Sequence, residues 1–142
     1  MGVWALDVFG NDAAADLGFE LEDAPSNDAV IEILRARLAT VISGSSGRVS
    51  PSDYDEAIAA AALVIAVDDA SVLPDSAEHY GPQPWPPAGL IVPEDVRQLG
   101  LKALDRALDP LDNEWFDVSD EAGIWPEQSA KVQDLRSRLN DV

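Results

Sequence analysis

The feature that most constrains the fold is the apolar run AIAAAALVIAV, from Ala57 to Val67. It is too short to cross a bilayer, because a membrane-spanning helix needs about 20 apolar residues. Its alanine content favours a helix over a buried strand, since alanine has the highest helix propensity. The run is apolar on nearly all sides after Glu56, so we expect it to be the central, most buried helix.

Start and stop signals divide the rest of the chain into further helices. Ser50 followed by Pro51 is a preferred helix start and opens the central helix, which we expect to end near Asp68. The other expected helices run from a cap at Asn11 or Asp12 to about Asp23, from a cap at Asn27 or Asp28 to about Ser43, from Pro93 to the stop at Asp109 and Pro110, and from Trp125 and Pro126 to the C-terminal region. The segment DNEWFDVSDEAG between the last two is a turn or a short helix. The sequence predicts an all-α, single-domain bundle of about five helices over residues 1–142, with little or no strand.

Two regions of the chain carry aromatic residues outside the expected helices. In the N-terminal stretch, Trp4 and Phe9 are expected to anchor the entry segment, with Phe9 placed as the outer half of a hydrophobic staple. Residues 69–92 form a Pro-rich connecting loop containing GPQPWPPAG, which cannot be helix interior or central strand. Its Trp85 either docks into an aromatic groove of another protein or packs on its own domain, and packing is the favoured interpretation.

Negative charge is the strongest compositional signal. The formal net charge is −18 at pH 7, and residues 1–34, 49–96 and 107–130 contain acidic side chains but no Lys or Arg. Such a chain repels nucleic acid and anionic membrane surfaces, because both are bound through Lys and Arg. A basic protein would be attracted, although the charge could equally serve only solubility.

The sequence contains few of the residue types from which catalytic sites and metal sites are built. The chain has no cysteine and one histidine, His79, expected to be a surface or packing residue. No phosphate-binding glycine motif occurs, and DPLDNEWFD has the oxygen density of a calcium loop but lacks its register. We therefore assign no catalytic residue, metal ligand or cofactor. Without a secretory signal or a membrane span, the expected location is the cytoplasm.

The opening MGVWALDVFGNDAAAD, the helix LGLKALDRALD, the EWFD segment and the closing VQDLRSRL together resemble a known family. It is the bacterial domain-of-unknown-function family four-two-five-nine, whose members commonly open MGxWGxGPFDNDDAAD. The matching positions are Gly2, Trp4, Phe9, Asn11, Asp12, Ala14 and Asp16, whereas Leu6, Asp7 and Val8 depart from the pattern. The resemblance implies a small bacterial helical domain and carries no activity with it.

The favoured function is a non-catalytic acidic protein that binds a basic partner, in its sharpest form an inhibitor or immunity-type protein covering a cationic site on a toxin or nuclease. Acidic and aromatic residues of one segment are the expected binding residues, because charge speeds association and aromatic rings supply contact area. They are Asp109, Asp112, Glu114, Trp115, Phe116, Asp117, Asp120 and Glu121. The alternatives are a metal-assisted hydrolase using the clustered carboxylates, and a scaffold whose acidity serves only solubility. The sequence leaves the oligomeric state open.

Overall fold

The described part of the chain, residues 12–43, 49–69, 82 and 85–141 of a computed structural model, is helical and contains no β-strand. Its helices are α1 (Asp12–Glu22), α2 (Asn27–Ser43), α3 (Pro51–Ala66), α5 (Glu94–Leu108), α6 (Glu114–Glu121) and α7 (Trp125–Asn140). The all-α prediction is confirmed, but the count of about five is too low. The segment left open between a turn and a short helix is helix α6, whose cap and stop signals are described below.

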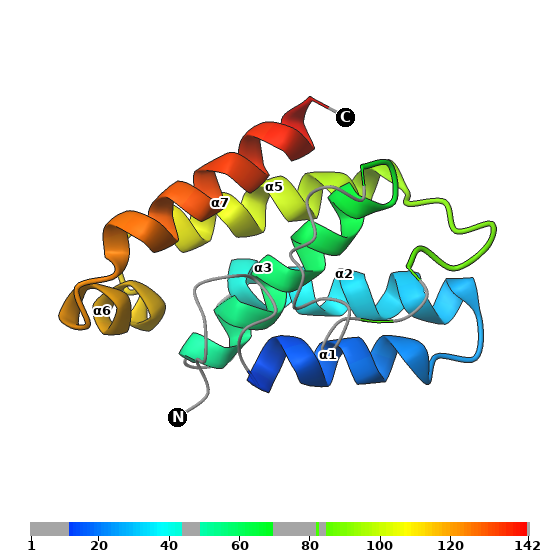
Figure 1. The fold of residues 1–142 in the computed structure, drawn as a ribbon, viewed down its shortest axis with the longest axis horizontal. Helices are drawn as coiled ribbons and strands as arrows, with labels where there is room; N and C mark the ends of the chain where they lie inside the picture. Colours follow the sequence, from blue (N-terminus) through cyan, green and yellow to red (C-terminus); the bar gives the residue numbers. More distant parts are fainter. Residues whose placement is uncertain (1–11, 44–48, 70–81, 83–84, 142) are drawn as a thin grey trace.

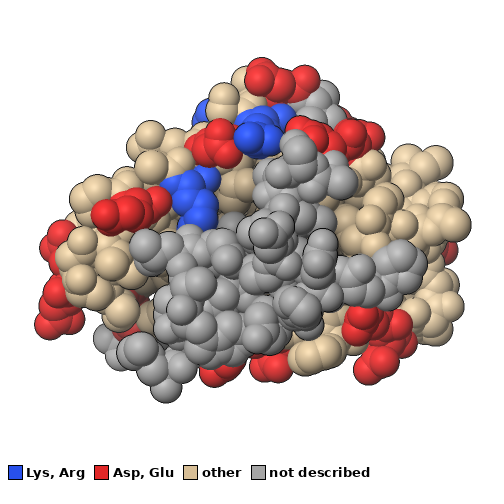
Figure 2. All heavy atoms as spheres, in the orientation of Figure 1, with Lys and Arg blue, Asp and Glu red and all other residues tan. Residues whose placement is uncertain are grey.

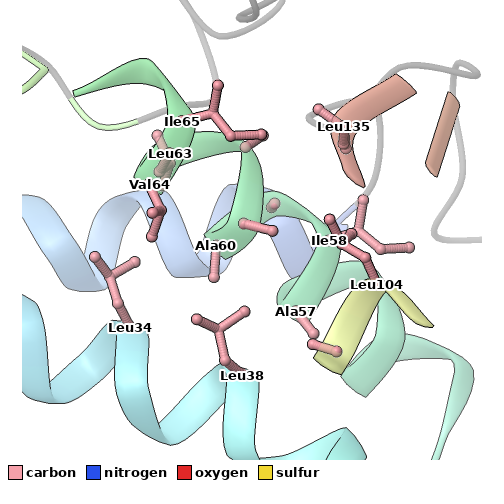
Figure 3. Packing of buried hydrophobic residues seen from close by; sticks show 14 of the residues in the cluster. Leu34, Leu38, Ala57, Ile58, Ala60, Leu63, Val64, Ile65, Leu104 and Leu135 are labelled. Carbon is pink, nitrogen blue, oxygen red and sulfur yellow. The ribbon is translucent and has the colours of Figure 1, made fainter. Parts of the chain in front are cut away.

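Helix α3 is the centre of the packing and contacts every other described helix. All ten residues from Ala57 to Ala66 are buried, as the alanine-rich run predicts. In Figure 1, α3 crosses obliquely between the α1 and α2 layer and the α5 and α7 layer. Leu34 and Leu38 of α2 point towards it, as Figure 3 shows. The small side chains of α3 let larger residues of its neighbours fill the space between the helices.

The helix starts follow local hydrogen-bond chemistry. At α3, the Ser50 hydroxyl accepts from the backbone N–H of Asp53, and the Asp53 carboxylate accepts from the N–H of Ser50, which makes a complete capping box. At α2, the cap is Ser26, whose hydroxyl accepts from the Ala29 N–H at 3.1 Å. The expected cap at Asn27 or Asp28 is therefore wrong by one or two residues, because Ser26 reaches the free N–H first.

The described part of the Pro-rich segment packs on its own domain. Trp85 is half-buried against the core, and its indole N–H donates to the backbone oxygen of Leu63 at 3.0 Å. Asn27 fixes the following turn, since its side-chain amide donates to the oxygen of Ala88 at 3.0 Å. The packing interpretation of Trp85 is thus confirmed.

Some predictions concern residues outside the described ones: the anchoring roles of Trp4 and Phe9, the placement of His79, and the loop around residues 44–48. Among the helices that are described, none combines the length and the apolar character needed to cross a membrane.

Candidate functional site

The turn between α5 and α6 is held by two polar side chains. Asn113 is almost fully buried, and its amide donates to the backbone oxygens of Ala107 at 3.0 Å and Asp109 at 2.9 Å. Arg106 donates to the backbone oxygens of Asp109 at 3.2 Å, Asp112 at 2.9 Å, and Leu111. Asn113 satisfies carbonyls at the C-terminal end of α5, which have no helical partner, and Arg106 also satisfies carbonyls of the turn itself. Together they fix where α6 begins.

Helix α6 is short but closed at both ends. The side-chain oxygen of Asn113 caps it by accepting from the Phe116 N–H at 2.9 Å. At the other end, Gly123 has φ +75°, its N–H donates to the oxygen of Asp120, and the Ile124 N–H donates to the oxygen of Ser119. This pair of bonds is a Schellman stop, which favours glycine at the left-handed position.

Trp115 is the anchor of α6. Its side chain is 3% exposed, stacks on Tyr54 of α3 with ring centroids 6.2 Å apart, and meets the edge of Trp125 of α7 at 5.7 Å. Its indole N–H donates to Oδ1 of Asp55, on α3, at 3.0 Å. Ser119 is the only other buried residue of α6. Trp115 is therefore the one large side chain of α6 that is buried in the interior.

Asp55 is a titratable group within this junction. Burial raises the pKa of its carboxyl to about 6, against the smaller opposing effects of the Trp115 hydrogen bond and the positive charge of Lys131. Asp55 stands in the polar stretch SPSDYDE, and nothing in that stretch marks it as a partly buried carboxyl. Ile58, Ala59 and Ala62 follow Asp55 at helical spacing, so they share one face of α3 with it. All three are buried, and the pattern can be seen in the sequence.

The outer surface of α6 is acidic and partly apolar. Asp117, Asp120 and Glu121 are exposed and share one face of the helix, because they are three and four residues apart. Two large hydrophobic side chains lie close to them in the chain: Leu111 is 71% exposed and Val118 is 54% exposed. Figure 2, drawn in the orientation of Figure 1, shows acidic side chains at the end of the molecule where α6 lies.

The eight predicted binding residues thus separate into several environments. Trp115 is in the interior and offers no surface to a partner, and Phe116 is half-buried with its ring 4.7 Å from that of Trp125. Asp109 is exposed but structural, since its carboxylate accepts from the Leu111 N–H at 3.0 Å and pairs with Arg106. Glu114 is half-buried. The four that are exposed without such a structural role are Asp112, Asp117, Asp120 and Glu121.

Arginines elsewhere in the protein are paired with carboxylates of neighbouring helices. Arg35 links α2 to Asp95 of α5 at 3.0 Å, and Arg97 of α5 pairs with Asp68 at 2.9 Å. Further pairs between elements are Arg37 with Glu20 and Glu56, Arg136 with Asp105, and Arg138 with Asp69. These pairs compensate acids along α1, α2, α3, α5 and α7, whereas residues 107–130 contain no Lys or Arg. The exposed carboxylates of α6 are therefore among those that no arginine of the described residues neutralises.

A family model for a domain of unknown function, DUF4259, matches residues 2–131. The chain belongs to the DUF4259 family. The match spans α1 to the first turns of α7 and includes all of α6, so the acidic helix and its Trp115 anchor lie within the DUF4259 domain. No curated protein and no solved structure matches the chain.

The carboxylates in the described part of this DUF4259 chain do not form a metal-binding group. Within residues 12–43, 49–69, 82 and 85–141, no group of three or more Asp, Glu or His side chains is placed to hold a metal ion. The predicted acids spread over the turn and α6.

A cavity of about 260 Å³ lies at the other end of α1, where the α1–α2 turn meets the Pro-rich segment. Leu21, Val30, Pro82, Trp85 and Pro87 provide its apolar wall, and Glu22, Ser26 and Asn27 lie among its polar residues. Asp55 and the α6 residues do not line it. The Asp55 carboxyl has a pKa suited to proton transfer near neutral pH, but this cavity does not bring a substrate to it.

Proposed function

We propose that this DUF4259 protein is a non-catalytic binding protein, and that the surface of α6 docks onto a basic protein. The observation that carries the proposal is a set of uncompensated carboxylates on α6 together with exposed apolar side chains, Val118 on the helix and Leu111 in the turn that precedes it. Asp117, Asp120 and Glu121 supply negative charge, while Leu111 and Val118 supply apolar area beside them. Charged groups at an interface set the rate and specificity of association, and apolar contacts add affinity.

The same surface disfavours a second copy of the chain as the partner. Two α6 surfaces brought together would place like charges opposite one another, which costs free energy. A partner with Lys or Arg around an apolar patch removes this penalty. The finer form of the proposal is an inhibitor or immunity-type role, in which α6 covers the cationic site of a toxin or nuclease.

A matched pair of variants tests the proposal. The α6-neutral variant carries Asp117→Asn, Asp120→Asn and Glu121→Gln, and the α1/α2-neutral variant carries Asp16→Asn, Asp23→Asn and Asp28→Asn. Both remove three negative charges from exposed positions, the second set at α1 and α2. Immobilised wild-type protein and both variants are incubated with an extract of the source cells, and the bound proteins are identified.

We expect a basic protein that binds the wild type and the α1/α2-neutral variant but is lost with the α6-neutral variant. Leu111→Ser with Val118→Ser should also weaken capture while leaving the charge unchanged. Equal capture by both charge variants would contradict the proposal. Titration calorimetry with Ca²⁺, Mg²⁺ and Mn²⁺ separates the hydrolase alternative, since tight stoichiometric binding would favour a metal site over a docking surface.

A further inference from the structure

The cavity of about 260 Å³ beside the α1–α2 turn is formed by two parts of the chain that are far apart in sequence. One part lies within residues 21–30, from the end of α1 to the first turn of α2, and the other contains Pro82, Trp85 and Pro87. In Figure 1 the α1–α2 turn and the segment that leads into α5 lie at the right of the view, whereas α6 lies at the left. The cavity is therefore separate from the proposed docking surface, and what it binds does not depend on that proposal.

Hydrogen bonds hold the walls of the cavity in place. The Trp85 indole N–H donates to the backbone oxygen of Leu63 at 3.0 Å, so the ring has only its apolar and π surface to offer the cavity. The Asn27 amide donates to the oxygen of Ala88 at 3.0 Å and joins the start of α2 to the turn after Trp85. The cavity is thus largely preformed, as small-molecule sites usually are. It is smaller than the roughly 300–1,000 Å³ of sites for drug-sized ligands, so it suits a smaller molecule.

The charge around the cavity favours a cation. Glu22 is one of the lining residues, and the exposed Asp23 and Asp28 are next to lining residues in the chain. Neither part of the chain that forms the cavity brings a Lys or Arg, because residues 1–34 and 49–96 contain none. The C-terminal end of α1 and the N-terminal end of α2 meet here, and their dipoles have opposite signs, so these partial charges largely offset one another. The formal charges then decide the sign, and they are negative.

We propose that this cavity binds a small organic cation, an ammonium group carried on an apolar body. The body packs against Leu21, Val30 and Trp85, and the ammonium group lies towards Glu22. An ammonium group is stabilised by a carboxylate and by the face of an indole ring. A carboxylate or phosphate ligand would be repelled by Glu22, and a neutral molecule of the same shape would lack the ionic contact.

Three probes of similar size and different charge test the proposal: phenethylamine, 2-phenylethanol and phenylacetate. Each is titrated at pH 7 and constant ionic strength, and the NMR resonance of the Trp85 indole N–H, assigned through its loss in Trp85→Phe, reports binding. We expect phenethylamine to shift this resonance to saturation and to bind at least about tenfold more tightly than 2-phenylethanol. Phenylacetate should bind most weakly.

A matched pair of variants tests the ionic contact. Glu22→Gln changes an exposed position and should leave the fold intact, but it should weaken phenethylamine binding by about fivefold or more and leave 2-phenylethanol unchanged. Asp16→Asn removes a charge from an exposed position of α1 that does not line the cavity, and it should leave both affinities unchanged. Ala24→Leu enlarges a lining residue and should weaken the binding of all three probes.

Equal affinity for the three probes would overturn the proposal, as would a Trp85 resonance that phenethylamine does not shift. An equal loss of phenethylamine binding in Glu22→Gln and Asp16→Asn would also overturn it, because the net charge of the protein, and not this cavity, would then attract the cation. If Ala24→Leu does not fold, the two charge variants still decide. No probe involves α6, so these results are independent of the capture experiment.

Discussion

Helix α3 is buried on all sides from Ala57 to Ala66, whereas α6 buries only Trp115 and Ser119. Helix α3 contacts every other described helix, and α6 is held by aromatic contacts of Trp115 with Tyr54 and Trp125 and of Phe116 with Trp125. The two helices meet at Tyr54 and Asp55 of α3. The difference teaches that the core and the proposed docking surface are located in different parts of this fold: α3 organises the core, and α6 presents charge and apolar surface at one end.

The largest expected effect on stability comes from a substitution in α3, and a substitution in α6 should have a much smaller one. Leu63 of α3 is fully buried, so Leu63→Ala should lower the free energy of unfolding by about 2–5 kcal/mol, through lost apolar burial and the cavity left behind. Val118→Ala on α6 should change it by less than about 0.5 kcal/mol, since that side chain is mostly exposed. Urea denaturation of both variants measures the difference. A Val118→Ala cost comparable to that of Leu63→Ala would mean that α6 belongs to the core.

Trp115→Phe sharpens the comparison at the junction itself. The smaller ring leaves unfilled space and removes the donor to the Asp55 carboxylate. We therefore expect the free energy of unfolding to fall by about 2–4 kcal/mol at pH 7. Trp85→Phe is the matched control, because it also removes an indole N–H, but one that donates to a backbone oxygen from a half-buried ring. It should cost less, about 1 kcal/mol. A larger cost for Trp85→Phe than for Trp115→Phe would show that Trp115 is not the anchor of α6.

Asp55→Asn should stabilise the protein at pH 7. The pKa of Asp55 is raised to about 6 in the folded state, so its contribution to stability is complete below the ordinary value of 3.8 and is lost as the pH rises through about 6. At pH 7 the partly buried Asp55 carboxyl of the wild type is ionised, which lowers the stability of the folded state. Asn carries no charge, so the substitution should raise the free energy of unfolding by about 1–3 kcal/mol. At pH 4 the gain should vanish. Denaturation curves at the two pH values measure both quantities, and a gain independent of pH would exclude ionisation as its cause.

The smallest expected effect concerns the ion pairs between helices. Asp105 and Arg136 join α5 to α7, but their side chains are about half exposed, at 53% and 42%. Asp105→Ala should therefore lower the free energy of unfolding by less than about 1 kcal/mol, and the loss should shrink further at high salt. Thermal denaturation at two salt concentrations measures it. A loss as large as that of Leu63→Ala would show that pairs on the surface, and not α3, hold the helices together.

The sequence predicts α3 far better than it predicts α6. The run from Ala57 to Val67 is long, apolar and preceded by Ser50 and Pro51, so composition, length and capping agree. Helix α6 has only eight residues and two buried positions, which is too few for a periodic pattern to appear. Its boundaries depend on Asn113 and Gly123, residue types that are as common in turns as at helix ends. The sequence therefore does not decide between a turn and a short helix for residues 112–123.

The role of the eight acidic and aromatic residues in binding stays a prediction, and their geometry was only partly accessible from the sequence. Sequence places acids around Trp115, but it cannot tell that the indole points inward, because this orientation is fixed by Tyr54 and Asp55 about 60 residues away. The spacing of Asp55 to Ile58 and Ala62 predicts that it lies on the inward side of α3, where it is partly buried. The polar stretch SPSDYDE around it concealed that signal.

The central proposal for this protein is that the negative charge on α6 guides a basic partner to it. The most direct test is the salt dependence of the affinity for that partner, measured by calorimetry with the wild type and the two neutral variants. We predict that affinity falls with salt for the wild type and for the α1/α2-neutral variant, and much less for the α6-neutral variant. The same dependence on salt in all three proteins would contradict the claim.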